Sequence, residues 1–199
     1  MFGILSFRIK RAIKLLKSMQ EDRLHQAPNP VRIQKEIAIY RKIAKIYARL
    51  VGHKKWPFAH IQAECCYRAS AGLDDAESQY ILGKKLLDEA IFREKLQSEM
   101  IFESLSNELR IKDLYKDAHG YLHSAVSDKP IQAKRLLGLC YINGWGVNAD
   151  KDKGFDLIIA SIEQENSWPR VQKVFAELGI NQSEFFSELF QHRKNPGSH

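Results

Sequence analysis

Hydrophobic residues recur every three or four positions along most of the chain, which is the spacing of amphipathic helices. The clearest example is VRIQKEIAIYRKIAKIYARLV at residues 31–51, where one face is apolar. From residue 56 onward, helices of about 10–16 residues alternate with short breaks, and the sequence lacks the alternating β-branched runs typical of strands. The pattern therefore predicts an all-α fold.

The first 19 residues, MFGILSFRIKRAIKLLKSM, predict a basic amphipathic helix with no acidic residue. Its apolar stripe includes Phe2, Leu5, Ile9 and Leu16. Three interpretations are open: the helix docks on the body of the same protein, lies on an anionic membrane surface with these four residues as its anchor, or is an organelle-targeting peptide. No apolar run approaches the roughly 20 residues of a membrane span. We assign residues 1–27 to this helix and the proline-containing break that follows it.

Two stretches align at an offset of 54–55 residues, YRASAGLDDAESQYILGKKLLDEA at 67–90 and YLHSAVSDKPIQAKRLLGLCYING at 121–144. Each contains a Leu-Gly pair, Leu82-Gly83 in the first and Leu137-Gly138 in the second. A glycine within a helix costs about 1 kcal/mol relative to alanine. The matched glycines therefore indicate helices that cross closely. The intervening region, 91–115, predicts an insertion or an elongated helix pair.

The stretch LLGLCYINGWGVNADKDKGF at 136–155 raises the question of a ligand loop or a turn between helices. Gly144 and Gly146 suit backbone angles that other residues resist. Asp150 can accept backbone hydrogen bonds at the start of the next helix. A calcium loop would require glutamate where Ile159 stands. The stretch therefore predicts a turn between two helices.

This stretch, extended to AKRLLGLCYINGWGVNADKDKGFDLI, resembles the Sel-one-like repeat, a relative of the tetratricopeptide repeat. The resemblance is best over 120–165 and weaker over 60–90, where only Leu82 and Gly83 match. The family pattern has alanine where this chain has Gly154. The matching positions are Ala133, Leu137, Gly138, Tyr141, Gly144, Gly146, Val147, Asp150 and Lys153.

The resemblance implies a short α-solenoid of stacked helix hairpins over residues 28–192. The composition of the last residues, 193–199, predicts a disordered tail. The resemblance also implies a non-enzymatic scaffold or adaptor that binds another protein. Bacterial members of the family commonly serve in secretion or host-interaction complexes, so a subunit of a larger complex, or an accessory to one, is expected.

The net charge of +7 is unevenly distributed, which bears on the partner. Residues 1–60 contain 14 Lys/Arg and 3 acidic residues, whereas the remainder contains 17 Lys/Arg and 21 acidic residues. The basic part predicts a protein partner with an acidic or amphipathic surface. Nucleic acid is not favoured, because no aromatic residues interleave with the cations of residues 31–51. The candidate partner-binding residues are Lys35, Arg41, Lys42, Lys45 and Arg49. A peripheral membrane protein held by residues 1–19 is the alternative function.

The sequence does not predict a catalytic residue, a cofactor or a metal site. Cys65, Cys66 and Cys140 lack a CxxC spacing, and we expect reduced, buried thiols in a cytoplasmic protein. His119 and His123 are four residues apart and could share a helical face, but no third metal ligand stands at a recognisable spacing.

Overall fold

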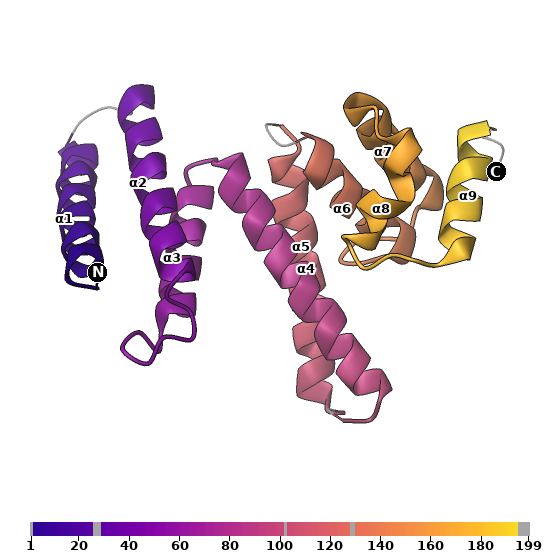
Figure 1. The fold of residues 1–199 in the computed structure, drawn as a ribbon, viewed down its shortest axis with the longest axis horizontal. Coiled ribbons are helices and arrows are strands. Elements are labelled where there is room, and N and C mark those ends of the chain that lie inside the picture. The colour runs from indigo at the N-terminus through magenta and orange to yellow at the C-terminus, as the bar shows by residue number, and fades with distance from the viewer. Residues whose placement is uncertain (1, 26–28, 102, 128–129, 195–199) are drawn as a thin grey trace. The chain divides into compact units, whose positions relative to one another are not determined.

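The computed structural model describes residues 2–25, 29–101, 103–127 and 130–194 (Figure 1). The side chains of residues 2–6, 22–24 and 130 lie outside this description. Within the described residues every regular element is helical, which confirms the predicted all-α class. The elements are α1 (Phe2–His25), α2 (Pro30–Ala48), α3 (Ala59–Ala71), α4 (Ala76–Ser98), α5 (Leu105–Ala125), α6 (Pro130–Asn143), α7 (Lys151–Glu165), the 3-10 turn η1 (Trp168–Arg170), α8 (Val171–Ala176) and α9 (Ser183–Lys194).

The chain divides into two compact units, Met1–Leu82 and Gly83–His199, and each is described separately. The division falls within the region 28–192 that the sequence assigns to the repeats. At the C-terminal end, α9 continues through Arg193 and Lys194. These two residues are therefore helical and do not belong to the expected disordered tail, whereas residues 195–199 lie outside the described residues.

The first unit begins its second helix with a side-chain cap. The Asn29 Oδ1 atom accepts hydrogen bonds from the backbone N–H groups of Val31 at 2.9 Å and Arg32 at 3.4 Å. These N–H groups have no partner within the helix, so the cap stabilises the first turn. Pro30 occupies the first helical position, where its missing N–H and fixed φ angle carry no penalty.

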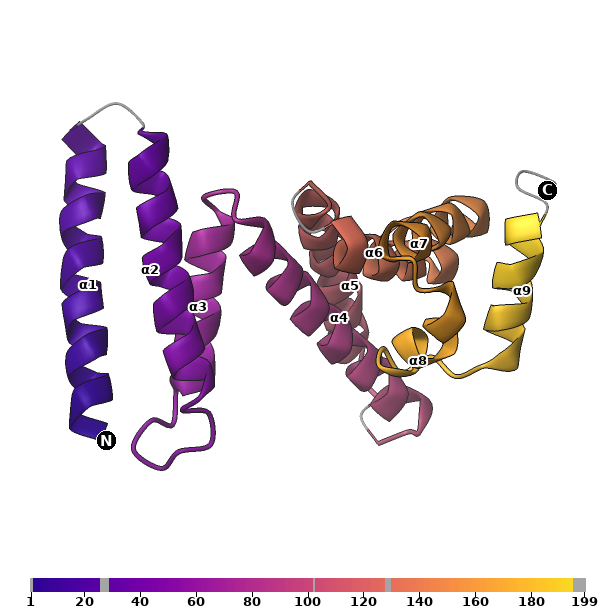
Figure 2. The same ribbon diagram turned by 45° about the horizontal axis from the view of Figure 1, so that its top comes forward.

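Apolar side chains from α1, α2 and α3 form the core of this unit. The three helices lie side by side in Figures 1 and 2. The Gln20 side-chain amide on α1 also donates a hydrogen bond of 2.6 Å to the Tyr40 hydroxyl on α2. The buried core residues are Ile9, Leu16, Ile43, Tyr47, Leu50, Ala59 and Ala63.

In the second unit, glycines allow helices to approach closely. A Cβ atom added at Gly83 on α4 would lie 2.7 Å from Leu122 Cγ on α5. A Cβ atom at Gly138 on α6 would lie 2.7 Å from the carbonyl oxygen of Gly154 on α7, and the reverse distance is also 2.7 Å. Real Cβ atoms do not approach carbonyl oxygens this closely, so the α6–α7 crossing requires residues without a side chain, whereas at Gly83 a Cβ atom would require the Leu122 side chain to shift. Gly154, the departure from the family pattern, is therefore part of the backbone contact between α6 and α7.

The helix pair that precedes this hairpin is elongated. α4 has 23 residues and α5 has 21, whereas α6 has 14 and α7 has 15. The region 91–115 comprises the end of α4, the connection and the start of α5. This confirms the predicted elongated helix pair.

Candidate functional site

The turn between α6 and α7 is fixed by a helix C-cap, two glycines and a helix N-cap. Gly144 and Gly146 have positive φ angles of 69° and 72°. The Trp145 N–H donates to the Cys140 carbonyl at 2.9 Å, the six-residue bond of a Schellman motif. Asp150 Oδ1 then accepts from the Lys153 N–H at 3.0 Å and caps α7. These contacts bear out the predicted inter-helix turn.

The same turn presses Trp145 against α5. A Cβ atom at Gly146 would lie 2.2 Å from the Tyr115 carbonyl oxygen, so the turn touches the α5 backbone directly. The Trp145 ring stacks on the Tyr115 ring, with centroids 5.4 Å apart and planes 3° from parallel. The Tyr115 hydroxyl donates a 2.5 Å hydrogen bond to Glu94 Oε2 on α4, which orients the tyrosine in turn. Burial and this bond to a carboxylate raise the pKa of Tyr115, so the hydroxyl keeps its proton and remains the donor.

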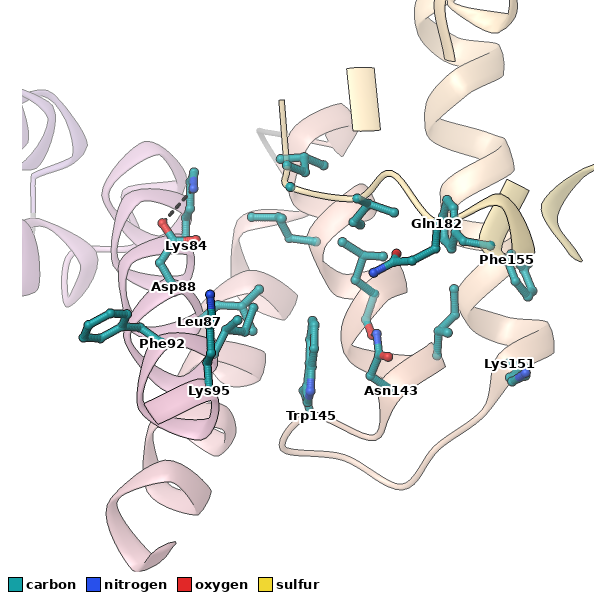
Figure 3. Close-up of a pocket in the computed structure, with 18 of the residues that line it drawn as sticks. Lys84, Leu87, Asp88, Phe92, Lys95, Asn143, Trp145, Lys151, Phe155 and Gln182 are labelled. Atoms are coloured by element: carbon teal, nitrogen blue, oxygen red, sulfur yellow. Dashed lines mark hydrogen bonds and ion pairs between the residues drawn. The ribbon is translucent and has the colours of Figure 1, made fainter. Parts of the chain in front are cut away.

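Trp145 forms one wall of an apolar groove in the second unit. The groove has a volume of about 720 Å³. In Figure 3 the Trp145 ring stands between Leu87, Phe92 and Lys95 of α4 on one side and Phe155 of α7 on the other. The apolar lining consists of Leu87, Ile91, Phe92, Leu136, Leu139, Ile142, Trp145, Phe155, Leu178, Ile180 and Phe185.

One wall of this groove is open to solvent. Phe92 is 61% exposed although it belongs to the apolar lining. An exposed aromatic residue in a lining that also contains the half-buried Trp145 is typical of a surface that gains free energy when a ligand covers it. The site is therefore suited to binding an apolar group.

Charged residues surround the apolar lining of the groove. Lys84 Nζ lies 2.7 Å from Asp88 Oδ2, and Lys151 Nζ lies 2.9 Å from Glu188 Oε2. Lys95 Nζ is 3.8 Å from its carboxylate neighbour Glu99, which is outside the lining. Lys95 is thus the lining cation with the longest of these ion-pair distances, and it is the one most available to a carboxylate on a ligand.

Two of the five candidate partner-binding cations, both on α2, form ion pairs within the first unit. Arg41 contacts Asp75 at 3.5 Å and also pairs with Glu77, and Lys45 Nζ lies 3.2 Å from Glu77 Oε1. These two cations therefore form ion pairs within the chain, a feature that the sequence pattern did not predict. The remaining three members, which are exposed, are Lys35, Lys42 and Arg49.

Two of the four expected membrane-anchor residues, the two whose side chains the structure describes, are not free. Ile9 and Leu16 are buried in the core of the first unit. The side chains of Phe2 and Leu5 lie outside the described residues. Among the described residues, no helix combines the length and the apolar character that crossing a bilayer requires.

The three thiols occupy different environments, and only one is buried as expected. Cys140 is buried, and burial raises its pKa to about 12. Cys66 is half-buried, and burial raises its pKa to about 11. Both thiols are therefore protonated at neutral pH and are weak nucleophiles. Cys65 is exposed, which corrects the expectation of burial.

His119 and His123 do share a face of α5, with ring centroids 6.1 Å apart. The His119 ring packs edge-on against Tyr141 at 5.5 Å, and burial lowers its pKa, with His123 and Lys153 adding to the effect. Across the described parts of the chain, no group of three His, Cys, Asp or Glu residues is placed to hold a metal ion.

The structure brings the repeat residues together in the second unit, apart from Leu82, which ends the first. Ala133, Leu137 and Tyr141 are buried on α6. Sequence reasoning did not select Trp145 or Phe92 as site residues. A signal for Trp145 was present in the sequence, because it is a large aromatic residue between the two glycines of the predicted turn, Gly144 and Gly146.

Comparison of the chain with known protein families, with curated proteins and with solved structures finds no match. The functional conclusion therefore depends on the geometry of the site.

Proposed function

We propose that the protein is a non-enzymatic scaffold or adaptor, built as a short solenoid of Sel-one-like hairpins, and that its groove binds an amphipathic segment of a partner protein. The apolar face of that segment enters the groove, and an acidic residue beside it pairs with Lys95. Such a protein acts as a subunit of a larger complex or as an accessory to one.

The observation that carries this proposal is the placement of Trp145. Its ring is fixed by stacking on Tyr115, so little side-chain freedom is lost when a ligand binds. It faces an apolar groove with Phe92 exposed on α4. Tryptophans fixed beside apolar pockets commonly carry most of the free energy of a protein–protein contact.

Two further features support a binding role. The tight α6–α7 crossing at Gly138 and Gly154 agrees with the hairpin packing that the resemblance implies, and stacked hairpins typically present extended binding surfaces. The thiols of Cys66 and Cys140 are held in their protonated forms and are poorly suited to nucleophilic catalysis.

A peptide selection tests the proposal and does not require the partner to be identified. A random peptide library displayed on phage is selected on the immobilised full-length protein, and the affinities of the selected peptides are measured by fluorescence anisotropy. We expect peptides with apolar residues beside Asp or Glu. Trp145→Ala should weaken their binding about 30-fold, as expected for the loss of a central aromatic contact.

Two surface variants make the test independent of folding. Phe92→Ser removes an exposed side chain of the groove and should weaken binding about tenfold. Leu109→Ser is the matched control, because Leu109 on α5 is 54% exposed and lies outside the groove lining. Selected peptides that bind the Phe92 and Trp145 variants as tightly as the wild type, or a selection that enriches no peptide, would contradict the proposal.

A further inference from the structure

A second interaction surface lies on the outward half of α1 in the first unit. Phe7 is 65% exposed and Leu15 is 51% exposed on this helix. Eight residues separate them, which is about 12 Å along the helix axis and about 80° around it, so both lie on the same half of α1. Five exposed cations accompany them, and residues 1–20 contain no acidic residue: the cations are Arg8, Lys10, Arg11, Lys14 and Lys17.

The opposite half of α1 is already engaged. Ile9 and Leu16 are buried in the core of the first unit, and Gln20 is hydrogen-bonded to Tyr40 on α2. The outward half is therefore available while the helix stays packed on its own unit. This separates it from the stripe of Phe2, Leu5, Ile9 and Leu16 that the sequence pattern suggests as an anchor.

We propose that the outward half of α1 binds an anionic phospholipid surface with the helix axis in the plane of the interface. Two apolar side chains about two turns apart can enter the boundary between headgroups and acyl chains. The lysines and arginines extend beside them towards lipid phosphates and carboxylates, which is favourable because an anionic leaflet attracts basic side chains near its surface.

A phospholipid surface fits these residues better than a nucleic acid does. Duplex phosphates would engage the cations but would leave Phe7 and Leu15 without an apolar environment. Stacking on single-stranded bases would use Phe7 alone, because Leu15 has no aromatic face. A lipid interface accommodates the cations and the apolar side chains at once, which neither form of nucleic acid does.

Vesicle co-sedimentation of the full-length protein tests this surface. We expect binding to phosphatidylcholine vesicles that contain about 30% phosphatidylserine and little binding to phosphatidylcholine alone, since the cations require an anionic leaflet. Replacing Lys10, Lys14 and Lys17 with Gln should weaken binding about 100-fold. The Phe7→Ser, Leu15→Ser variant keeps every charge and should weaken binding about tenfold or more.

The matched control replaces the buried residues of the same helix. An Ile9→Ala, Leu16→Ala variant should bind the anionic vesicles at least as tightly as the wild type, because the outward half is intact. If this variant loses binding while the Phe7, Leu15 variant keeps it, the membrane contact belongs to the inner stripe and the proposal is wrong.

Two other results would overturn the proposal. One is equal binding of the wild type to neutral and anionic vesicles. The other is binding to a duplex oligonucleotide that is as tight as binding to anionic vesicles and is unaffected by the Phe7, Leu15 variant. The groove variant Trp145→Ala should leave vesicle binding unchanged, so failure of this surface is distinguishable from failure of the peptide-binding groove.

Discussion

The α6–α7 hairpin of the second unit and the α1–α2 pair of the first unit bury their contact faces in different ways. In the hairpin, backbone meets backbone at Gly138 and Gly154, where no side chain fits. In the α1–α2 pair, apolar side chains such as Ile9 and Leu16 fill the space between the helices. Backbone contact requires one particular residue type, whereas side-chain contact accepts many apolar residues. Backbone contact between helices can therefore be recognised from glycines in the sequence, and it does not tolerate their substitution.

The largest expected effect is at the turn of the hairpin. Gly146→Ala would place Cβ 2.2 Å from the Tyr115 carbonyl oxygen at a φ angle of 72°. Strain and overpacking together should lower the free energy of unfolding by about 3–4 kcal/mol. Urea unfolding followed by circular dichroism measures the loss.

Gly179→Ala is the matched control for this substitution. Gly179 has a φ angle of 79°, but nothing lies within 4 Å of its Cβ position. Only the backbone strain applies, so the loss should be about 1–2 kcal/mol. Equal losses at the two glycines would show that the turn does not press on α5, and the account of Trp145 placement would be wrong.

A smaller loss of stability is expected at the crossing of α6 and α7, and its control should instead gain stability. Gly138→Ala gains helix propensity but forces α6 and α7 apart, and it should destabilise the protein by about 1–2 kcal/mol. Gly120→Ala on α5 has open space around Cβ and should stabilise by up to about 1 kcal/mol. Thermal unfolding of both variants tests the contrast, and stabilisation by Gly138→Ala would refute the close crossing.

The smallest expected effect concerns the end of the hairpin opposite the turn. Arg135 Nη2 lies 2.5 Å from Glu165 Oε2, and this hydrogen bond is the main cause that lowers the pKa of Glu165. A lowered carboxyl pKa adds stability above the unfolded pKa of about 4.3, and this stability is lost as pH falls through the folded pKa. Glu165→Gln should therefore cost about 1 kcal/mol or less at pH 7.

The pH profile provides the check on this pair. Urea unfolding of the wild type and the Glu165→Gln variant should give free energies that converge as the pH falls below about 4. A difference between the two proteins that is independent of pH would show that Glu165 acts by packing and not by its charge.

Local features of the α6–α7 hairpin could be predicted from sequence because neighbouring residues determine them. The positive φ angles at Gly144 and Gly146 and the cap at Asp150 depend on a few adjacent positions. The all-α class follows from the apolar period for the same reason. The solenoid arrangement stays a proposal.

Features that depend on distant residues could not be predicted. Arg41 and Lys45 appear on the polar face of α2, but their carboxylate partners Asp75 and Glu77 are more than 30 residues away in sequence. Periodicity places a cation on a face and does not tell whether that face meets a partner or another helix of the same chain. The groove at Trp145 was missed for the same reason, since α4, α6, α7 and α9 all contribute to it.

The most direct test of the proposed groove is the fluorescence of Trp145 itself. In a Trp56→Phe, Trp168→Phe background, Trp145 is the one emitting tryptophan, because the chain has 3 tryptophans. Titration with a selected amphipathic peptide that lacks tryptophan should shift the Trp145 emission to shorter wavelength and reduce its quenching by acrylamide. The Kd from this titration should equal the Kd measured by fluorescence anisotropy. Tight peptide binding that leaves both the emission and the quenching of Trp145 unchanged would contradict the groove as the binding site.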